Sequence, residues 1–355
     1  DVLGRRAEIE QARDVADALV RAGLEVETVE TVGVGIEGPV VVGQVLEIDE
    51  FEASNGKTIR FCQVGVGETE PRGIVCGAHN FAVGDKVVVS LPGAVLPGGF
   101  AIAARKTYGH ISDGMICSVR ELGVGDDHTG ILVVDPGARV GAEAVAALGL
   151  RDDVLDIAVT PDRGYCLSIR GVAREAATAY GVAFRDPADV TGTPGADVRL
   201  DGADTAPSRD VTLADPTAAD HYVLQAIEGF DPAAPAPLQM RLRLMLAGLR
   251  PVSLAVDVTN YVMLELGPPL HAFDAAKLTG GIVVRRARID ERLETLDHVV
   301  RRLDPGDVLI TDDSGPIGLA GTMGGLTTEI DEKSSDLLIE AAHFSDVAVA
   351  RMSRR

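Results

Sequence analysis

Apolar residues recur every three to four positions in some segments of this chain and at every second position in others. The helical period over about residues 8–22 predicts an amphipathic helix that ends at Gly23, and alternation over 24–29 predicts a strand. Between residues 40 and 134, short apolar or alternating runs are separated by turns rich in Gly and Pro. These runs are 40–46, 59–64, 74–76, 86–91 and 131–134. Five strands in this length predict a small closed β-barrel of the OB-fold type.

The same two periods return after Gly149. A strand-like run within 155–168 precedes an Ala-rich helix over about 169–180, which mirrors the first helix and strand. Residues 186–208, rich in Pro, Gly, Asp and Thr, predict a linker. The remainder predicts strands that alternate with helices, which indicates an α+β multidomain chain that ends in a mixed α/β domain. The predicted strands are 221–227, 281–286 and 308–311, and the predicted helices are 237–247 and 258–266.

Length and composition fit a multidomain globular protein. A chain of 355 residues predicts two or three domains at about 150 residues each. No apolar run approaches the roughly 18 residues that span a bilayer, and the first residues do not form a signal peptide. We therefore expect a cytoplasmic protein that is not inserted in a membrane. The missing initial Met and an end in mid-pattern suggest a fragment of a longer chain.

The net charge and the cysteine spacing limit the kinds of ligand and metal site that we expect in this chain. A formal net charge of -21 argues against general nucleic-acid coating, because phosphate binding depends on Lys and Arg, so any RNA contact must be local. Such a contact could use basic residues of the barrel, namely Arg60, Arg72, Arg105, Lys106 and Arg120. The four cysteines, Cys62, Cys76, Cys117 and Cys166, lie far apart without a CxxC pair. We expect buried reduced thiols rather than a zinc site or disulfides.

Polar residues interrupt apolar runs in residues 257–274. Asp257, Thr259 and Asn260 stand in the predicted helix, and a Gly-Pro-Pro turn at 267–269 precedes His271. The turn would fold His271 back toward the helix and allow a compact polar pocket. Alternatively, Asp257 and Thr259 cap a helix and His271 is a core histidine with its hydrogen bonds satisfied.

A carboxylate and a glycine cluster follow. Glu340 stands in an apolar, strand-like run, where burial is costly without a partner; alternatively, it points to solvent. Gly318, Gly321, Gly324 and Gly325 indicate backbone that approaches a ligand, or else a tight turn with a bulge. The spacing is not that of a phosphate-binding P-loop.

Three runs in this order, 257–274, 318–325 and 337–344, closely resemble the editing region of the bacterial phenylalanyl-tRNA synthetase beta subunit. Residues 76–81, 91–99 and 112–118 resemble the tRNA-binding OB domain of the same subunit. The resemblance covers essentially the whole chain. It implies a small discontinuous α/β domain (1–37 plus 149–190), an OB-fold domain inserted in it (38–148) and a B3/B4-type editing domain truncated at its C-terminus (191–355).

The resemblance also implies a site that hydrolyses tyrosine wrongly attached to tRNA(Phe). The matching residues are His271, Glu340, Thr259, Asn260, Gly321 and Gly324. In this interpretation Glu340 accepts the phenol O–H, backbone at Gly321 positions the amino acid, and His271 orients a water or the terminal ribose. No metal or cofactor is expected in this part of the protein, because an aminoacyl ester is already reactive toward a positioned water.

For the complete enzyme, the resemblance implies ATP, Mg²⁺, tRNA(Phe) and an alpha subunit, in a heterotetramer of two alpha and two beta chains. The sequence departs from the family pattern in two places. Pro268 stands where the family usually has Gln, which alters the turn before His271, and the chain stops at Arg355, before a segment that in the family completes the pocket. A tRNA-binding or assembly module with a vestigial pocket, and an unrelated small-molecule hydrolase, remain alternatives.

Overall fold

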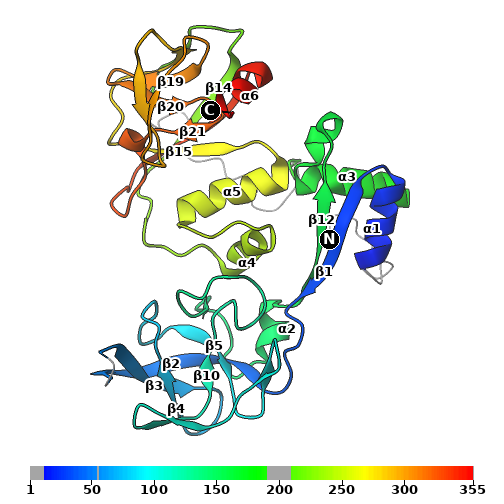
Figure 1. Ribbon diagram of the computed structural model, residues 1–355, viewed down its shortest axis with the longest axis vertical. Helices are drawn as coiled ribbons and strands as arrows, with labels where there is room; N and C mark the ends of the chain where they lie inside the picture. Colours follow the sequence, from blue (N-terminus) through cyan, green and yellow to red (C-terminus); the bar gives the residue numbers. More distant parts are fainter. Residues whose placement is uncertain (1–11, 54–55, 190–208, 355) are drawn as a thin grey trace. The chain divides into compact units, whose positions relative to one another are not determined.

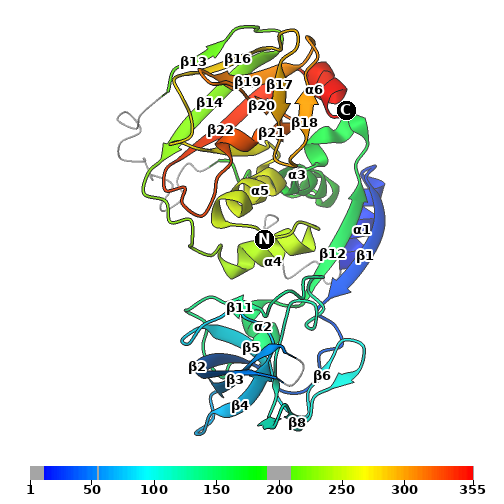
Figure 2. The same cartoon turned by 60° about the vertical axis from the view of Figure 1, so that its left-hand side comes forward.

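The described chain forms two compact units. A computed structural model describes residues 12–53, 56–189 and 209–354. Within these residues, one unit comprises residues up to 158 together with 237–251, and the other comprises 159–236 and 252–354. The first is called the barrel unit and the second the C-terminal unit. Figure 1 and Figure 2 show the elements of each.

The barrel unit is built around a nearly closed sheet with the order β10-β5-β2-β3-β4, in which β11 also pairs with β5. The two edge strands of this sheet, β10 and β4, lie close together. The backbone amide of Asp113, just before β10, donates a hydrogen bond to the Gly73 carbonyl of β4 at 2.8 Å. The bounds of the barrel elements are β2 (Val40–Glu52), β3 (Thr58–Gly65), β4 (Arg72–Cys76), β5 (Lys86–Ser90), β6 (Val95–Leu96), β7 (Phe100–Ala101), β8 (Arg105–Thr107), β9 (His110–Ser112), β10 (Met115–Ile116), β11 (Val133–Val134) and α2 (Ala144–Leu148). The five expected strands are present, within a sheet that is nearly closed.

The same unit contains the first helix and strand and the strand that follows the barrel, whereas the second helix of the expected small domain, residues 169–180, lies in the C-terminal unit. α1 (Ala12–Arg21) packs beside β1 (Glu25–Val32), and β1 pairs antiparallel with β12 (Asp152–Ala158). The helix expected at 237–247 is α4 (Leu238–Leu246). It packs its buried Leu238 and Leu242 against the barrel core rather than within the C-terminal unit. The two compact units therefore do not meet at the boundary expected at residue 190. The division into three domains stays a prediction.

The C-terminal unit consists of two packed sheets with helices around them. One sheet has the order β13-β16-β19-β20-β21, and the other has the antiparallel order β14-β22-β15. The element bounds are η1 (Pro161–Cys166), α3 (Ile169–Tyr180), β13 (Val211–Leu213), β14 (Ala219–Ile227), α5 (Leu254–Leu266), β15 (Leu270–Asp274), β16 (Ile282–Arg286), β17 (Arg292–Glu294), β18 (Val300–Arg302), β19 (Val308–Asp312), β20 (Gly315–Leu319), β21 (Met323–Gly324), η2 (Leu326–Thr328), β22 (Leu337–Phe344) and α6 (Asp346–Met352). Most of the expected linker at 186–208 lies outside the described residues.

The core of the C-terminal unit lies between its two sheets. Phe273 and Leu338 from the three-stranded sheet are buried with Ile282, Leu309 and Ile317 from the five-stranded sheet. On the three-stranded sheet, α5 runs along β15 (Figure 1). The Ser253 hydroxyl accepts a hydrogen bond from the Val256 amide at the start of α5. The sandwich therefore fixes β15, β22 and the β20–β21 hairpin, the elements that surround the candidate site.

Candidate active site

A cavity of about 190 Å³ opens between the β20–β21 hairpin and one face of β15 and β22. It is called the editing-type cavity below, after the site that the sequence resemblance predicts. Its lining is mainly apolar, with two ionisable side chains, the buried Glu340 and the partly buried His271. The lining residues are Pro269, Leu270, His271, Phe273, Ile310, Gly318, Leu319, Gly321, Thr322, Met323, Gly324, Glu340, Ala342 and Phe344.

Strand register brings the two ionisable side chains together. β15 pairs antiparallel with β22, and His271 stands directly opposite Glu340. Directly paired residues of neighbouring strands point to the same face of a sheet, so both side chains face the core and the cavity. Glu340 is only 5% exposed, so the interpretation in which it points to solvent is wrong.

The glycines of this cluster meet different steric requirements. An added Cβ at Gly324 would lie 2.6 Å from Cε1 of His271, so the hairpin backbone approaches the imidazole directly. Gly321 has a φ of 63°, which favours glycine in the turn between β20 and β21. At Gly325 a Cβ would lie 2.5 Å from the Ile317 carbonyl oxygen, which is a constraint within the hairpin itself. The cavity wall therefore depends on Gly324, whereas Gly325 serves the hairpin.

Burial changes the charge of both ionisable groups. It raises the pKa of Glu340 from 4.5 to about 7, and the Tyr222 hydroxyl opposes that rise. Burial also lowers the pKa of His271 from 6.5 to about 4, so its imidazole is neutral at pH 7. Nε2 of His271 and Oε2 of Glu340 are buried without a hydrogen-bond partner among the described residues. A core histidine with its bonds satisfied does not fit this arrangement, whereas a polar ligand would supply the missing partners.

Two expected site residues lie outside the lining. Thr259 and Asn260 are on α5, and the Thr259 hydroxyl donates to the Val256 carbonyl at 2.8 Å within that helix. Asp257 is buried, and its carboxylate accepts from the Val252 amide at 2.8 Å, so it braces the start of α5. The structure therefore gathers His271, Glu340, Gly321 and Gly324 around one cavity. That Thr259 and Asn260 belong to the editing site stays a prediction.

Sequence reasoning missed Phe344 and Tyr222. Leu338, Glu340, Ala342 and Phe344 alternate along β22, so the period of two could have shown that Phe344 shares a face with Glu340. Tyr222 stands in a strand that was expected, but nothing in the sequence indicates that this strand lies beside β22.

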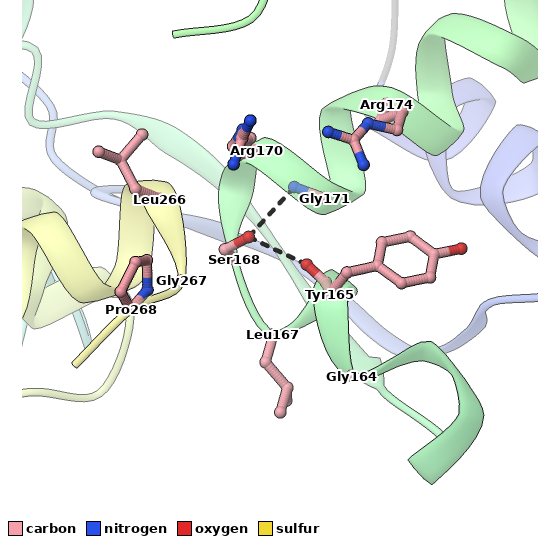
Figure 3. A pocket seen from close by; sticks show the side chains of 10 residues that line it. All are labelled: Gly164, Tyr165, Leu167, Ser168, Arg170, Gly171, Arg174, Leu266, Gly267 and Pro268. Carbon is pink, nitrogen blue, oxygen red and sulfur yellow. Dashed lines mark hydrogen bonds between the residues drawn. The ribbon is translucent and has the colours of Figure 1, made fainter. Parts of the chain in front are cut away.

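A second cavity of about 350 Å³ lies between the start of α3 and the end of α5 (Figure 3). Its polar groups already have partners. The Ser168 hydroxyl accepts from the Gly171 amide and donates to the Tyr165 carbonyl. Arg170 forms a two-point ion pair with Asp186, and the Arg174 guanidinium lies over the Phe184 ring. These contacts give each of these polar side chains a structural role, and we assign no chemistry to this cavity.

Two of the basic residues that could contact RNA are held in ion pairs. Arg60 bonds Glu50 and the Phe81 carbonyl, and Arg72 bonds Glu68 and Asp113. Lys106 and Arg120 are exposed, and Arg105 lies over the Phe100 ring at 5.8 Å. The RNA-binding face of the barrel therefore stays a prediction.

The cysteines are buried and free, as expected. Over residues 12–53, 56–189 and 209–354, no group of three or more His, Cys, Asp or Glu side chains is placed to hold a metal ion. In the same part of the chain, no helix is both long and apolar enough to cross a membrane.

Comparison with known proteins gives two family matches. Residues 218–355 match the family described as "B3/4 domain", which includes the editing-type cavity. Residues 40–143 match the family described as "Putative tRNA binding domain", which covers the barrel.

Curated relatives align with nearly the whole chain. The phenylalanine–tRNA ligase beta subunit of Thermobifida fusca is 62% identical over 97% of the chain, and that of Streptomyces avermitilis is 55% identical over 98%. The chain spans 41% of the length of each. An N-terminal fragment of the Pyrococcus horikoshii phenylalanyl-tRNA synthetase beta subunit aligns with 56% of the chain and 58% of its own, at 13% identity and a TM-score of 0.29, too low to support an argument.

Proposed function

Because the chain belongs to the family of phenylalanine–tRNA ligase beta subunits, we propose that its editing-type cavity hydrolyses tyrosine wrongly attached to tRNA(Phe). The observation that carries this proposal is the direct cross-strand pairing of His271 with Glu340 in a mainly apolar cavity. Both side chains have a buried polar atom without a partner among the described residues. An aromatic amino acid with a hydroxyl group can satisfy such a site.

The size and polarity of the cavity suit a phenol ring. A dry apolar cavity of about 150 Å³ holds one benzene molecule, and this cavity measures about 190 Å³. Glu340, partly ionised near pH 7, would accept the phenol O–H, and a hydrogen bond to a charged acceptor contributes about 1.5 to 3 kcal/mol. Phenylalanine cannot make this bond and would leave the carboxylate buried without its partner. The selectivity for tyrosine follows from that difference.

The neutral imidazole of His271 can hold a water or the terminal ribose of the tRNA. Nε2 has no partner among the described residues, and Gly324 allows the hairpin backbone to lie against the ring. The water attacks the ester carbonyl, the ester C–O bond breaks, and tyrosine and tRNA(Phe) are released. Thr259 and Asn260 lie on the helix that packs beside β15, and we assign them to the same site from the family resemblance.

The other functions proposed for the complete protein rest on membership of this family. We propose that the barrel is an OB-fold module that contacts tRNA, and that the C-terminal unit is a B3/B4-type editing domain. Formation of the aminoacyl ester with ATP and Mg²⁺ would belong to the alpha subunit, in a cytoplasmic assembly of two alpha and two beta chains.

The proposal is tested with Glu340→Ala in the full-length ligase. The variant should accumulate Tyr-tRNA(Phe) in the presence of tyrosine and ATP, with hydrolysis slower by roughly 10- to 100-fold, from the lost charged hydrogen bond. Charging with phenylalanine should stay within about twofold. Glu332→Ala, which removes an exposed glutamate of the same unit, is the matched control. Equal accumulation of Tyr-tRNA(Phe) by parent and Glu340→Ala would instead favour a tRNA-binding module with a vestigial pocket.

A further inference from the structure

Tyr222 stands on β14, which pairs with β22 on the opposite side from β15. On β14, Leu224 pairs directly with Glu340 and Tyr222 pairs with Ala342, so all four side chains share one face of the sheet. The Tyr222 ring meets the Phe344 ring edge-on at 6.5 Å between centroids. Phe344 lines the cavity, but Tyr222 is not among the lining residues. Glu340 on β22 therefore has His271 of β15 on one side and the β14 residues Leu224 and Tyr222 on the other.

Tyr222 brings a buried phenol hydroxyl close to this carboxyl. Its hydroxyl is buried, and no hydrogen bond of normal geometry satisfies it among the described residues, although it faces Glu340 closely enough to oppose the rise in the pKa of that carboxyl. In return, burial and then the Glu340 charge raise the pKa of Tyr222. A phenol that stays protonated remains a donor.

The other groups around the carboxyl supply no positive charge. His271, on β15, is kept neutral near pH 7 by burial, which lowers its pKa to about 4. The residues of the β20–β21 hairpin that line the cavity include no titratable side chain. Ionisation of Glu340 therefore depends on uncharged donors, and Tyr222 is the one on the neighbouring strand β14.

We propose that Tyr222 is a positioning residue for Glu340: its hydroxyl donates to one carboxylate oxygen and leaves the other turned toward the cavity for the hydroxyl of an aromatic substrate. This role rests on the proposed function of the cavity. A hydrogen bond to a carboxylate is about twice as strong as a bond between neutral groups. By favouring the carboxylate over the acid, Tyr222 would increase the preference for tyrosine over phenylalanine.

The test is Tyr222→Phe in the full-length ligase, with kcat/KM for hydrolysis of Tyr-tRNA(Phe) measured from pH 6 to pH 9 as a ratio to the parent. We expect a loss of about tenfold at pH 7, or about 1.4 kcal/mol, and a return toward the parent at pH 9, where the carboxylate ionises without help from Tyr222. A purely structural loss would be the same at every pH. Tyr165→Phe is the matched control, because it removes a tyrosine hydroxyl that bonds Glu175 at 2.8 Å outside the cavity.

A second variant covers the case in which Tyr222→Phe does not fold. Replacing Tyr222 with 3,5-difluorotyrosine keeps the ring and strengthens the donor, so the pH of half-maximal hydrolysis should fall. An unchanged pH profile in the folded variant overturns the role of Tyr222. If Glu340→Ala hydrolyses Tyr-tRNA(Phe) like the parent, the proposed function itself fails. If Glu340→Ala is impaired while Tyr222→Phe matches the parent at every pH, only the role of Tyr222 is lost.

Discussion

Replacing Glu340 with glutamine should change how the stability of the C-terminal unit depends on pH. Burial raises the pKa of this carboxyl from 4.5 to about 7, so the folded state keeps a proton that the unfolded state has already released. The stability that this proton contributes is fully present below pH 4.5 and is lost as pH rises through about 7. Glutamine has the same size and cannot ionise, so the variant lacks this loss.

The magnitude follows from the two pKa values. The interval from 4.5 to about 7 corresponds to roughly 3 kcal/mol of unfolding free energy. His271 acts in the opposite direction, because its pKa is lowered from 6.5 to about 4, and its contribution is lost as pH falls through that window. In the parent the two effects oppose each other between pH 4.5 and 6.5. Glu340→Gln should therefore expose the loss of stability that His271 causes on acidification.

The assay is urea unfolding followed by circular dichroism at pH 5, 6, 7 and 8. The unfolding free energy of Glu340→Gln minus that of the parent should increase by roughly 2 to 3 kcal/mol from pH 5 to pH 8, because the parent loses stability over this range and the variant does not. Glu332→Gln, at an exposed position, should show a difference that does not vary with pH. A constant difference for Glu340→Gln over this range would refute the raised pKa of the buried carboxyl.

Three further substitutions test the placement of single residues. Gly324→Ala should slow hydrolysis of Tyr-tRNA(Phe) by roughly 10- to 100-fold, because its Cβ would displace the His271 ring; Gly164→Ala, which meets open space, should have no effect. Asn80→Ala should lower the unfolding free energy of the barrel unit by about 2 kcal/mol in a denaturant titration, because Asn80 makes two 2.9 Å bonds to the backbone of Ile131. Asn260→Ala should slow hydrolysis less than Glu340→Ala does, because Asn260 does not line the cavity; an equal or larger effect would place the amide in contact with substrate.

Local pattern predicted most of the longer helices and strands of the fold. The helix expected at 169–180 is α3, which begins after the Ser168 cap and ends at Gly181 in the left-handed conformation. Alternation and turn residues likewise predicted β14, β16 and β19 to within a few residues. These signals are local, since caps, glycines and period act over a few residues.

Long-range packing could not be predicted from the same signals. α4 was expected as a helix, but nothing in its sequence indicates that Leu238 packs on the barrel core. The pairing of His271 with Glu340 depends on the register of strands far apart in the sequence, which local period does not fix. For the same reason, local pattern could not show that Tyr222 lies on the strand that pairs with the strand of Glu340.

The central claim, that this cavity selects an aromatic amino acid by its hydroxyl, is tested most directly with two preformed substrates. Tyr-tRNA(Phe) and Phe-tRNA(Phe) would each be mixed with the full-length ligase, and the rate of ester hydrolysis measured without ATP or free amino acid. We predict faster hydrolysis of Tyr-tRNA(Phe) by at least about 100-fold, because a site that hydrogen-bonds a substrate hydroxyl rejects the analogue without it. Equal rates for the two substrates, or binding of Tyr-tRNA(Phe) without hydrolysis, would contradict the account.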